Sequence, residues 1–225
     1  MSIASIPPLR FPGGHKAALS LTFDDGFRSE VQDALAALDP LGLKGTFFLI
    51  PEGIENHAEN MLSWEEARAL LAAGHEIGTH GYTKYKLHEV DDARLEYCTN
   101  GAWSTLRDRL GCAPVSYATP GGSDKTDPRV RTKIFENHLF LRENALIYGN
   151  RPGQPWSECK MRLRIEEAEK KGEWLVACIH SIIGGYSPFD SKEAFHEHCR
   201  WLHSKSDTLW IAPMGTVGRM LMQNP

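Results

Sequence analysis

Residues 20–26 read SLTFDDG, an alternating run that stops on two neighbouring carboxylates and a glycine. The alternation of apolar and small residues from Ala17 to Phe23 predicts a β-strand. Two carboxylates of ordinary pKa, about 4, repel each other when they lie side by side. A strand that ends on Asp24 and Asp25 therefore predicts a positive charge or a bound proton close to this pair.

The 225-residue chain has the composition of an ordinary globular protein, with 41% hydrophobic and 24% charged residues. Its net charge of −4 indicates neither a nucleic-acid partner nor an anionic membrane surface. No apolar run approaches the roughly 20 residues that cross a bilayer. Prolines interrupt the first residues, where a signal peptide needs an apolar core. We expect one domain over residues 1–225, located in the cytoplasm.

The five cysteines are odd in number and widely spaced, without a Cys-x-x-Cys pair. This pattern disfavours both a disulfide framework and a zinc knuckle. We therefore expect the cysteines to be reduced packing residues.

Strand-like and helix-like segments alternate along the chain. Further strands are predicted at residues 45–50, 75–79, 115–117, 174–179 and 208–211, with short candidates at 139–141 and 146–148. Helices are predicted at residues 29–41, 64–73, 91–110, 159–171, 191–204 and 217–222. Such alternation requires parallel strands joined by right-handed crossovers. The sequence thus predicts an α/β fold, an incomplete or distorted (β/α) barrel of about seven parallel strands.

Candidate functional residues follow several of these strands. In a barrel of this kind, catalytic groups collect at the carboxyl ends of the strands. Asp24 and Asp25, His80, the TPGG turn at residues 119–122 and His180 all come at such ends. The acidic pair alone has two interpretations, as caps of the following helix or as groups beside a divalent metal.

The segment Thr22–Gly26 (TFDDG) resembles the first signature of the polysaccharide deacetylase family, carbohydrate esterase family 4. Residues 74–80 (GHEIGTH) resemble the lead-in to the family's metal-binding histidines, and residues 175–180 (LVACIH) resemble its last signature. The resemblance implies that Asp24 is the catalytic base and His180 the general acid. It also implies a divalent metal, zinc or a similar ion, held by Asp25 and His80.

Residues 116–122 (SYATPGG) resemble the family's third signature. On this basis Tyr117, Pro120, Gly121 and Gly122 are expected to contribute to substrate binding. Ala118 stands where the family often has an arginine that steadies the base.

The second metal-binding histidine of the family is replaced in this chain by Lys84. An ammonium group has no lone pair, and lysine does not belong to the usual ligands of zinc. The positive charge of Lys84 could instead lie beside Asp25. A single ammonium does not reproduce the Lewis acidity of a metal ion or its effect on the pKa of bound water.

The resemblance implies a hydrolase that removes an acetyl group from an N-acetylated or O-acetylated sugar. Two alternatives remain open at this point. One is a catalytically impaired protein that retains a carbohydrate-binding groove, and the other is a metal-independent hydrolase of a small amide. The expected partner is therefore a carbohydrate or a small amide substrate, and not a membrane or a nucleic acid.

Overall fold

The computed structural model describes residues 9–121, 127–143, 145–148, 150–151, 154–155, 158–183 and 187–223. The main strands are β1 (Ala17–Asp25), β2 (Thr46–Leu49), β3 (Glu76–Thr79), β4 (Ser116–Ala118), β5 (Phe140–Arg142), β6 (Leu146–Tyr148), β9 (Trp174–Ile179) and β10 (Leu209–Ile211). A separate antiparallel ribbon contains β7 (Asn150–Arg151) and β8 (Gln154–Pro155).

The α-helices are α1 (Arg28–Leu38), α2 (Pro51–Glu55), α3 (Trp64–Ala72), α4 (Asp92–Glu96), α5 (Ala102–Leu110), α6 (Pro128–Ile134), α7 (Glu158–Lys171), α8 (Lys192–Ser204) and α9 (Met214–Gln223). Short 3₁₀ segments lie at Pro12–Gly14, Asp39–Leu41 and Leu87–Glu89, and a π-helical segment at Tyr97–Gly101 joins α4 to α5. Among the helices that the structure describes, none has both the length and the apolar character that a bilayer span requires.

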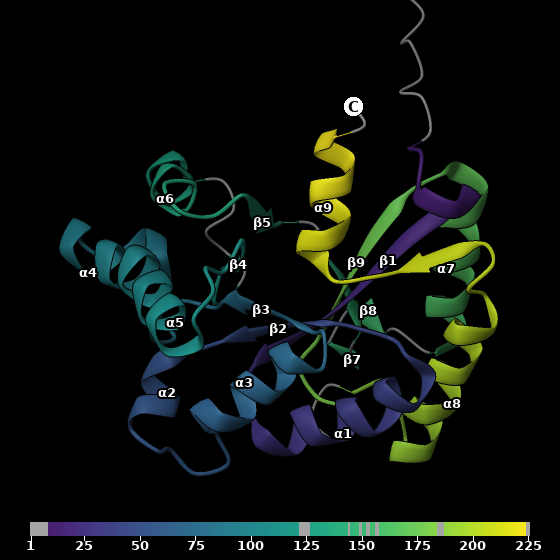
Figure 1. The fold of residues 1–225 in the computed structure, drawn as a ribbon, viewed down its shortest axis with the longest axis horizontal. Helices are drawn as coiled ribbons and strands as arrows, with labels where there is room; N and C mark the ends of the chain where they lie inside the picture. Colours follow the sequence, from purple (N-terminus) through teal and green to yellow (C-terminus); the bar gives the residue numbers. More distant parts are fainter. Residues whose placement is uncertain are drawn as a thin grey trace, which may run out of the picture.

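Eight strands form one parallel sheet in the order β5-β4-β3-β2-β1-β9-β6, with β10 paired to the beginning of β1. Helices surround this sheet (Figure 1). The two end strands, β5 and β6, are joined by only a few residues, so the sheet curls into a nearly closed barrel with a seam between them. The predicted distorted (β/α) barrel of about seven parallel strands is confirmed: seven strands follow one another around the sheet, and β10 pairs with β1 off this path.

Strand β1 is the central strand because it pairs with three others. It is bonded to β9 along one side and to β10 and then β2 along the other. All nine of its residues are buried. One set of alternate side chains, including Leu19, Leu21 and Phe23, packs under the helices, and the other set faces the barrel interior. Asp24 belongs to the interior set.

The six predicted helices begin and end close to the residues where the structure places them. Two further helices, α2 and α6, were not predicted, and each begins with a proline at its first position. The predicted helix at residues 91–110 contains the π-helical segment. Ser63 and Glu66 form the reciprocal capping bonds that the sequence pattern of α3 indicates.

The amino-terminal end of the barrel is closed by α9. The carboxylate of Glu76, at the start of β3, accepts hydrogen bonds from the hydroxyls of Thr46 and Ser116 and from the backbone N–H of Gly215. The Thr46 hydroxyl in turn accepts from the backbone N–H of Met214. Two of the unpaired N–H groups at the start of α9 thus find acceptors inside the barrel.

Replacing Glu76 with Ala is expected to lower the free energy of unfolding by about 3 kcal/mol, because three buried donors lose their acceptor. Glu76→Gln keeps one acceptor oxygen and should lose less. Denaturant titration measures the stability, and hydrogen exchange of α9 shows whether that helix detaches first. Equal stability of Glu76→Ala and the wild type would mean that this carboxylate does not hold α9.

Candidate active site

The end of β1 brings both acidic side chains to one side of the sheet. In a straight strand, Asp25 would point away from Asp24. Asp25 instead has φ +76°, a left-handed conformation that aspartate tolerates better than most residues, and Gly26 follows with φ +81°. A Cβ on Gly26 would lie 2.8 Å from Leu49 Cδ2. The glycine therefore permits the turn that places Asp25 beside Asp24.

The carboxylate of Asp24 is buried and is held by Arg142. Arg142 Nη1 and Nη2 donate to the two carboxylate oxygens at 2.6 Å each, and Nη1 also donates to Thr22 Oγ1 at 2.7 Å. Burial raises the pKa of Asp24, but the charges of Arg142 and His80 outweigh it and hold that pKa well below its usual range. Asp24 is consequently ionised throughout the working pH range.

Arg142 is the functional residue that the sequence analysis missed. It lies on β5, one strand beyond Ala118, the position where the family often has its arginine. Its guanidinium lies over the Phe48 ring, with Cζ 4.8 Å from the ring centre. The ring in turn occupies the space above Gly78, where a Cβ would meet Phe48 at 2.5 Å. The sequence feature that could have indicated Arg142 is its positive charge directly after the short predicted strand at residues 139–141.

His80 faces both acidic residues. Its Nδ1–H donates to the Ala118 carbonyl oxygen at 2.8 Å, which leaves Nε2 pointing at the carboxylates. His80 Nε2 lies 3.6 Å from Asp25 Oδ1 and 3.8 Å from Asp24 Oδ2. Gly81, with φ +73°, then turns the chain away so that position 84 can approach the site.

Lys84 pairs with Asp25, as the charge argument predicts. Lys84 Nζ lies 2.8 Å from Asp25 Oδ2, and 5.3 Å from the centre of the Phe27 ring. Glu30 is a further acidic residue of this region. Burial, together with the charge of Asp25, raises the pKa of Glu30 to about 8. Glu30 is therefore largely protonated at neutral pH.

These residues do not fit the divalent metal that the resemblance implies. Asp25 and His80 offer two ligand atoms, and the ammonium of Lys84 contributes a positive charge but no lone pair. That ammonium lies 2.8 Å from Asp25 Oδ2, while Asp25 Oδ1 faces His80 Nε2 at 3.6 Å. A cation of the protein thus takes the place beside Asp25.

His180 approaches Asp24 from the end of β9. His180 Nε2 lies 3.4 Å from Asp24 Oδ2, and the His180 side chain is 35% exposed. Burial lowers the pKa of His180, although the charges of Asp24 and Asp25 oppose this effect. The structure therefore brings the predicted base and the predicted acid into contact.

A cavity of about 300 Å³ lies beside Asp24, which does not line it. Its walls are formed by Asp25, His80, Lys84, Tyr85, Lys86, Pro120, Gly121 and His180. Pro120 and Gly121, two of the residues predicted to bind substrate, line this cavity. Tyr117 does not line the cavity, because its side chain is fully buried on the outer side of β4 and donates to the Cys98 carbonyl oxygen. Gly122 lies outside the described residues.

Three solved structures share this fold over nearly the whole chain. A protein from Mycobacterium smegmatis assigned as a polysaccharide deacetylase has a TM-score of 0.74 and 19% identity, covering 99% of this chain and 96% of its own. The peptidoglycan deacetylase PdaC from Bacillus subtilis has a TM-score of 0.66 and 17% identity, covering 92% of each chain. A family 4 acetyl xylan esterase from Clostridium thermocellum, in complex with a cobalt ion, has a TM-score of 0.65 and 17% identity, covering 90% and 91%.

Sequence comparison gives the family directly. Among curated proteins, none matches this chain. Residues 12–136, more than half of the chain, match the family described as polysaccharide deacetylase. This stretch includes Asp24, Asp25, His80 and Lys84, and it ends before Arg142 and His180. The chain therefore belongs to the polysaccharide deacetylase family.

Proposed function

We propose that this protein is a hydrolase that removes the acetyl group from an N-acetylated or O-acetylated sugar. The observation that carries the proposal is the 3.4 Å contact between Asp24 Oδ2 and His180 Nε2 beside a cavity large enough for a sugar residue. Asp24 acts as the base that takes a proton from the attacking water. His180 acts as the acid that protonates the leaving nitrogen or oxygen.

The cations of the site support this role. In acetyl hydrolysis, negative charge develops on the carbonyl oxygen in the transition state, and fixed donors aimed at that oxygen lower the barrier. The Lys84 ammonium lines the cavity next to Asp25 and can supply such a donor. One ammonium stabilises the developing charge less than a divalent ion, so we expect slower turnover than in a metal-dependent relative.

The substrate class is inferred from the relatives. The similar structures include a peptidoglycan deacetylase and an acetyl xylan esterase, both of which act on polysaccharides. Tyr85, at the cavity wall, offers a partly exposed ring of the kind that packs against sugars. A carbohydrate substrate therefore fits this site better than a nucleic acid. A small amide, hydrolysed without metal, would use the same Asp24 and His180.

A second candidate is a carbohydrate-binding protein with impaired catalysis. The observation that favours it is the double hydrogen bond from Arg142, which makes Asp24 a weak base. Lys84 favours it as well, since the site then lacks a Lewis acid. This candidate retains the cavity and its lining but predicts no acetate release.

Acetate release from N-acetylglucosamine oligomers and from acetylated xylan tests the proposal. We expect release that survives chelator treatment and that becomes faster as the pH falls from neutral to mildly acidic. The pH dependence follows because His180 must be protonated, and burial lowers the pKa of His180. Asp24 stays ionised over this range. Binding of oligomers without any acetate release would favour the carbohydrate-binding candidate.

The variant Lys84→His is expected to create a metal site with Asp25 and His80. Wild-type protein should retain no stoichiometric zinc or cobalt after dialysis, whereas Lys84→His should retain about one ion. With metal, its acetate release should rise by at least about tenfold. Lys86→His is the matched control, because Lys86 lines the same cavity but pairs with Glu89. Equal metal content in both variants would contradict the assignment of position 84.

The variant Arg142→Met removes the partner of Asp24. Burial should then raise the pKa of Asp24, and the acid limb of the pH–rate profile should move to higher pH, with a loss of rate on the order of 100-fold. Stability should also fall, by about 3 to 5 kcal/mol, because an unpaired carboxylate is left in the interior. The double variant Asp24→Asn with Arg142→Met should regain stability but not activity. An unchanged pH profile in Arg142→Met would contradict the role of Arg142.

A further inference from the structure

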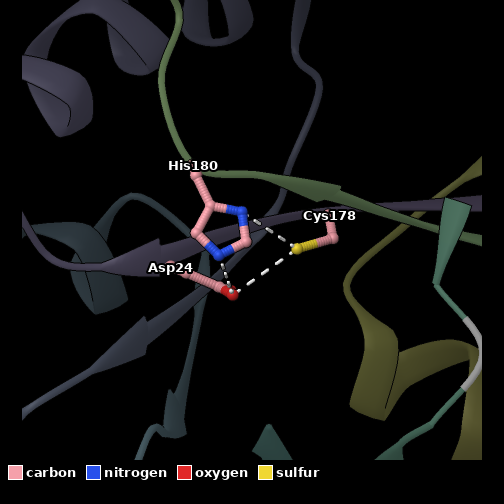
Figure 2. Close-up of side chains that lie close together, drawn as sticks. All are labelled: Asp24, Cys178 and His180. Carbon is pink, nitrogen blue, oxygen red and sulfur yellow. Dashed lines mark hydrogen bonds and ion pairs between the residues drawn. The ribbon is translucent and has the colours of Figure 1, made fainter. Parts of the chain in front are cut away.

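The cavity beside the candidate base and acid has room for a single sugar unit. Figure 2 shows the His180 imidazole turned toward Asp24, with Cys178 beside both. With about 300 Å³ of space, the cavity cannot hold a chain of several sugars. The further units of an oligosaccharide must therefore lie on the surface outside it, and the residues at its rim decide whether they bind there.

Tyr85 is an aromatic residue of the cavity wall that stays partly open to solvent. Its ring lies against Arg94, whose Cζ is 4.9 Å from the ring centre. Arg94 Nη1 also donates to the Tyr85 hydroxyl at 2.8 Å. These two contacts hold the ring in place, yet Tyr85 remains 38% exposed. A ligand can thus contact a ring that loses little freedom on binding.

A second aromatic pair lies on the same helix as Arg94. Tyr97 follows Arg94 by three residues, so the two side chains share one face where α4 continues into the π-helical segment. The centres of the Tyr97 and Tyr82 rings are 4.2 Å apart, and Tyr97 is 44% exposed. The Tyr82 carbonyl oxygen accepts from the backbone N–H of Glu52 at 3.1 Å, which holds the loop of Tyr82 and Tyr85 in place.

We propose that Tyr82, Tyr85, Arg94 and Tyr97, here called the tyrosine strip, bind the sugar units that follow the one in the cavity. This inference deepens the proposed function and rests on it. It narrows the substrate to an oligosaccharide or polysaccharide, and it disfavours a small amide or a single sugar. The rings offer flat apolar faces to the C–H groups of a sugar, and the tyrosine hydroxyls and the guanidinium offer hydrogen-bond donors to its hydroxyls.

Two features favour a binding role over packing alone. Single exposed apolar side chains are common on protein surfaces, whereas exposed aromatic residues that adjoin a cavity are typical of binding sites. Tyr85 and Tyr97 are both exposed, and Tyr85 forms part of the cavity wall. In addition, the π-helical segment begins at Tyr97. Such segments are rare and frequently occur at functional sites.

Calorimetric titration with the dimer and the hexamer of N-acetylglucosamine tests the tyrosine strip by binding alone. The wild type should bind the hexamer at least about tenfold more tightly than the dimer, because only the hexamer reaches Tyr97. Tyr97→Ala should remove most of this difference, and Tyr97→Phe, which keeps the ring, should retain it. Tyr85→Ala should weaken the binding of both. Equal affinity of the wild type for both lengths, or an unchanged hexamer affinity in Tyr97→Ala, would overturn the proposal.

Phe135→Ala is the matched control. Phe135 is 44% exposed, as Tyr97 is, and it also has an arginine against its ring, with Arg131 Cζ 5.7 Å from the ring centre. It is not among the described residues that line the cavity. This variant should leave both affinities unchanged. A loss of hexamer affinity as large as that in Tyr97→Ala would contradict a specific role of the tyrosine strip.

Acetate release provides the second readout. Tyr97→Ala should raise KM for the hexamer about five- to tenfold at unchanged kcat, because the strip binds the substrate away from the reacting groups. If the hexamer binds as expected but no acetate is released, the hydrolase proposal fails and the tyrosine strip stands. If acetate is released with the same KM for the dimer and the hexamer in every variant, the hydrolase proposal stands and the tyrosine strip fails.

Discussion

The structure depends on one buried ion pair, between Asp24 and Arg142. A carboxylate in the interior of a barrel is strongly disfavoured unless an opposite charge and good hydrogen bonds accompany it. Arg142 supplies both, with two bonds of 2.6 Å to Asp24. The pair also joins β1, the central strand, to β5 at the seam of the barrel. The same contact therefore stabilises the open edge of the sheet and keeps the candidate base ionised.

The position of Arg142 follows from the packing of the barrel interior. Asp24 pairs in register with Phe48 on β2, and Gly78 on β3 leaves room for the Phe48 ring. The guanidinium lies on that ring. Below this level, the interior is polar again, with Glu76 binding hydroxyls and the start of α9. The barrel interior thus holds an arginine on β5, the strand next to Ala118, the position where the family often has an arginine.

The two acidic residues of the TFDDG segment are neutralised separately. Arg142 holds Asp24 inside the barrel, and Lys84 holds Asp25 at the wall of the cavity. Two protein cations therefore balance two carboxylates in a family one of whose structural relatives binds cobalt. The charge is balanced, but a metal ion would also polarise a carbonyl and acidify water, which an ammonium does not do. In the proposed function, the chemistry that remains depends on Asp24 and His180.

The sequence by itself determined the class of fold and the strand ends that carry the site. Alternating strand and helix patterns require a parallel sheet, and parallel strands direct Asp24, His80 and His180 to one end of it. The tertiary structure alone decided which cation pairs with Asp24. Arg142 is 118 residues away in the sequence, on a strand too short for its pattern to reveal which way the side chain points. Only the closure of the barrel, with Phe48 packed over Gly78, brings Arg142 to Asp24.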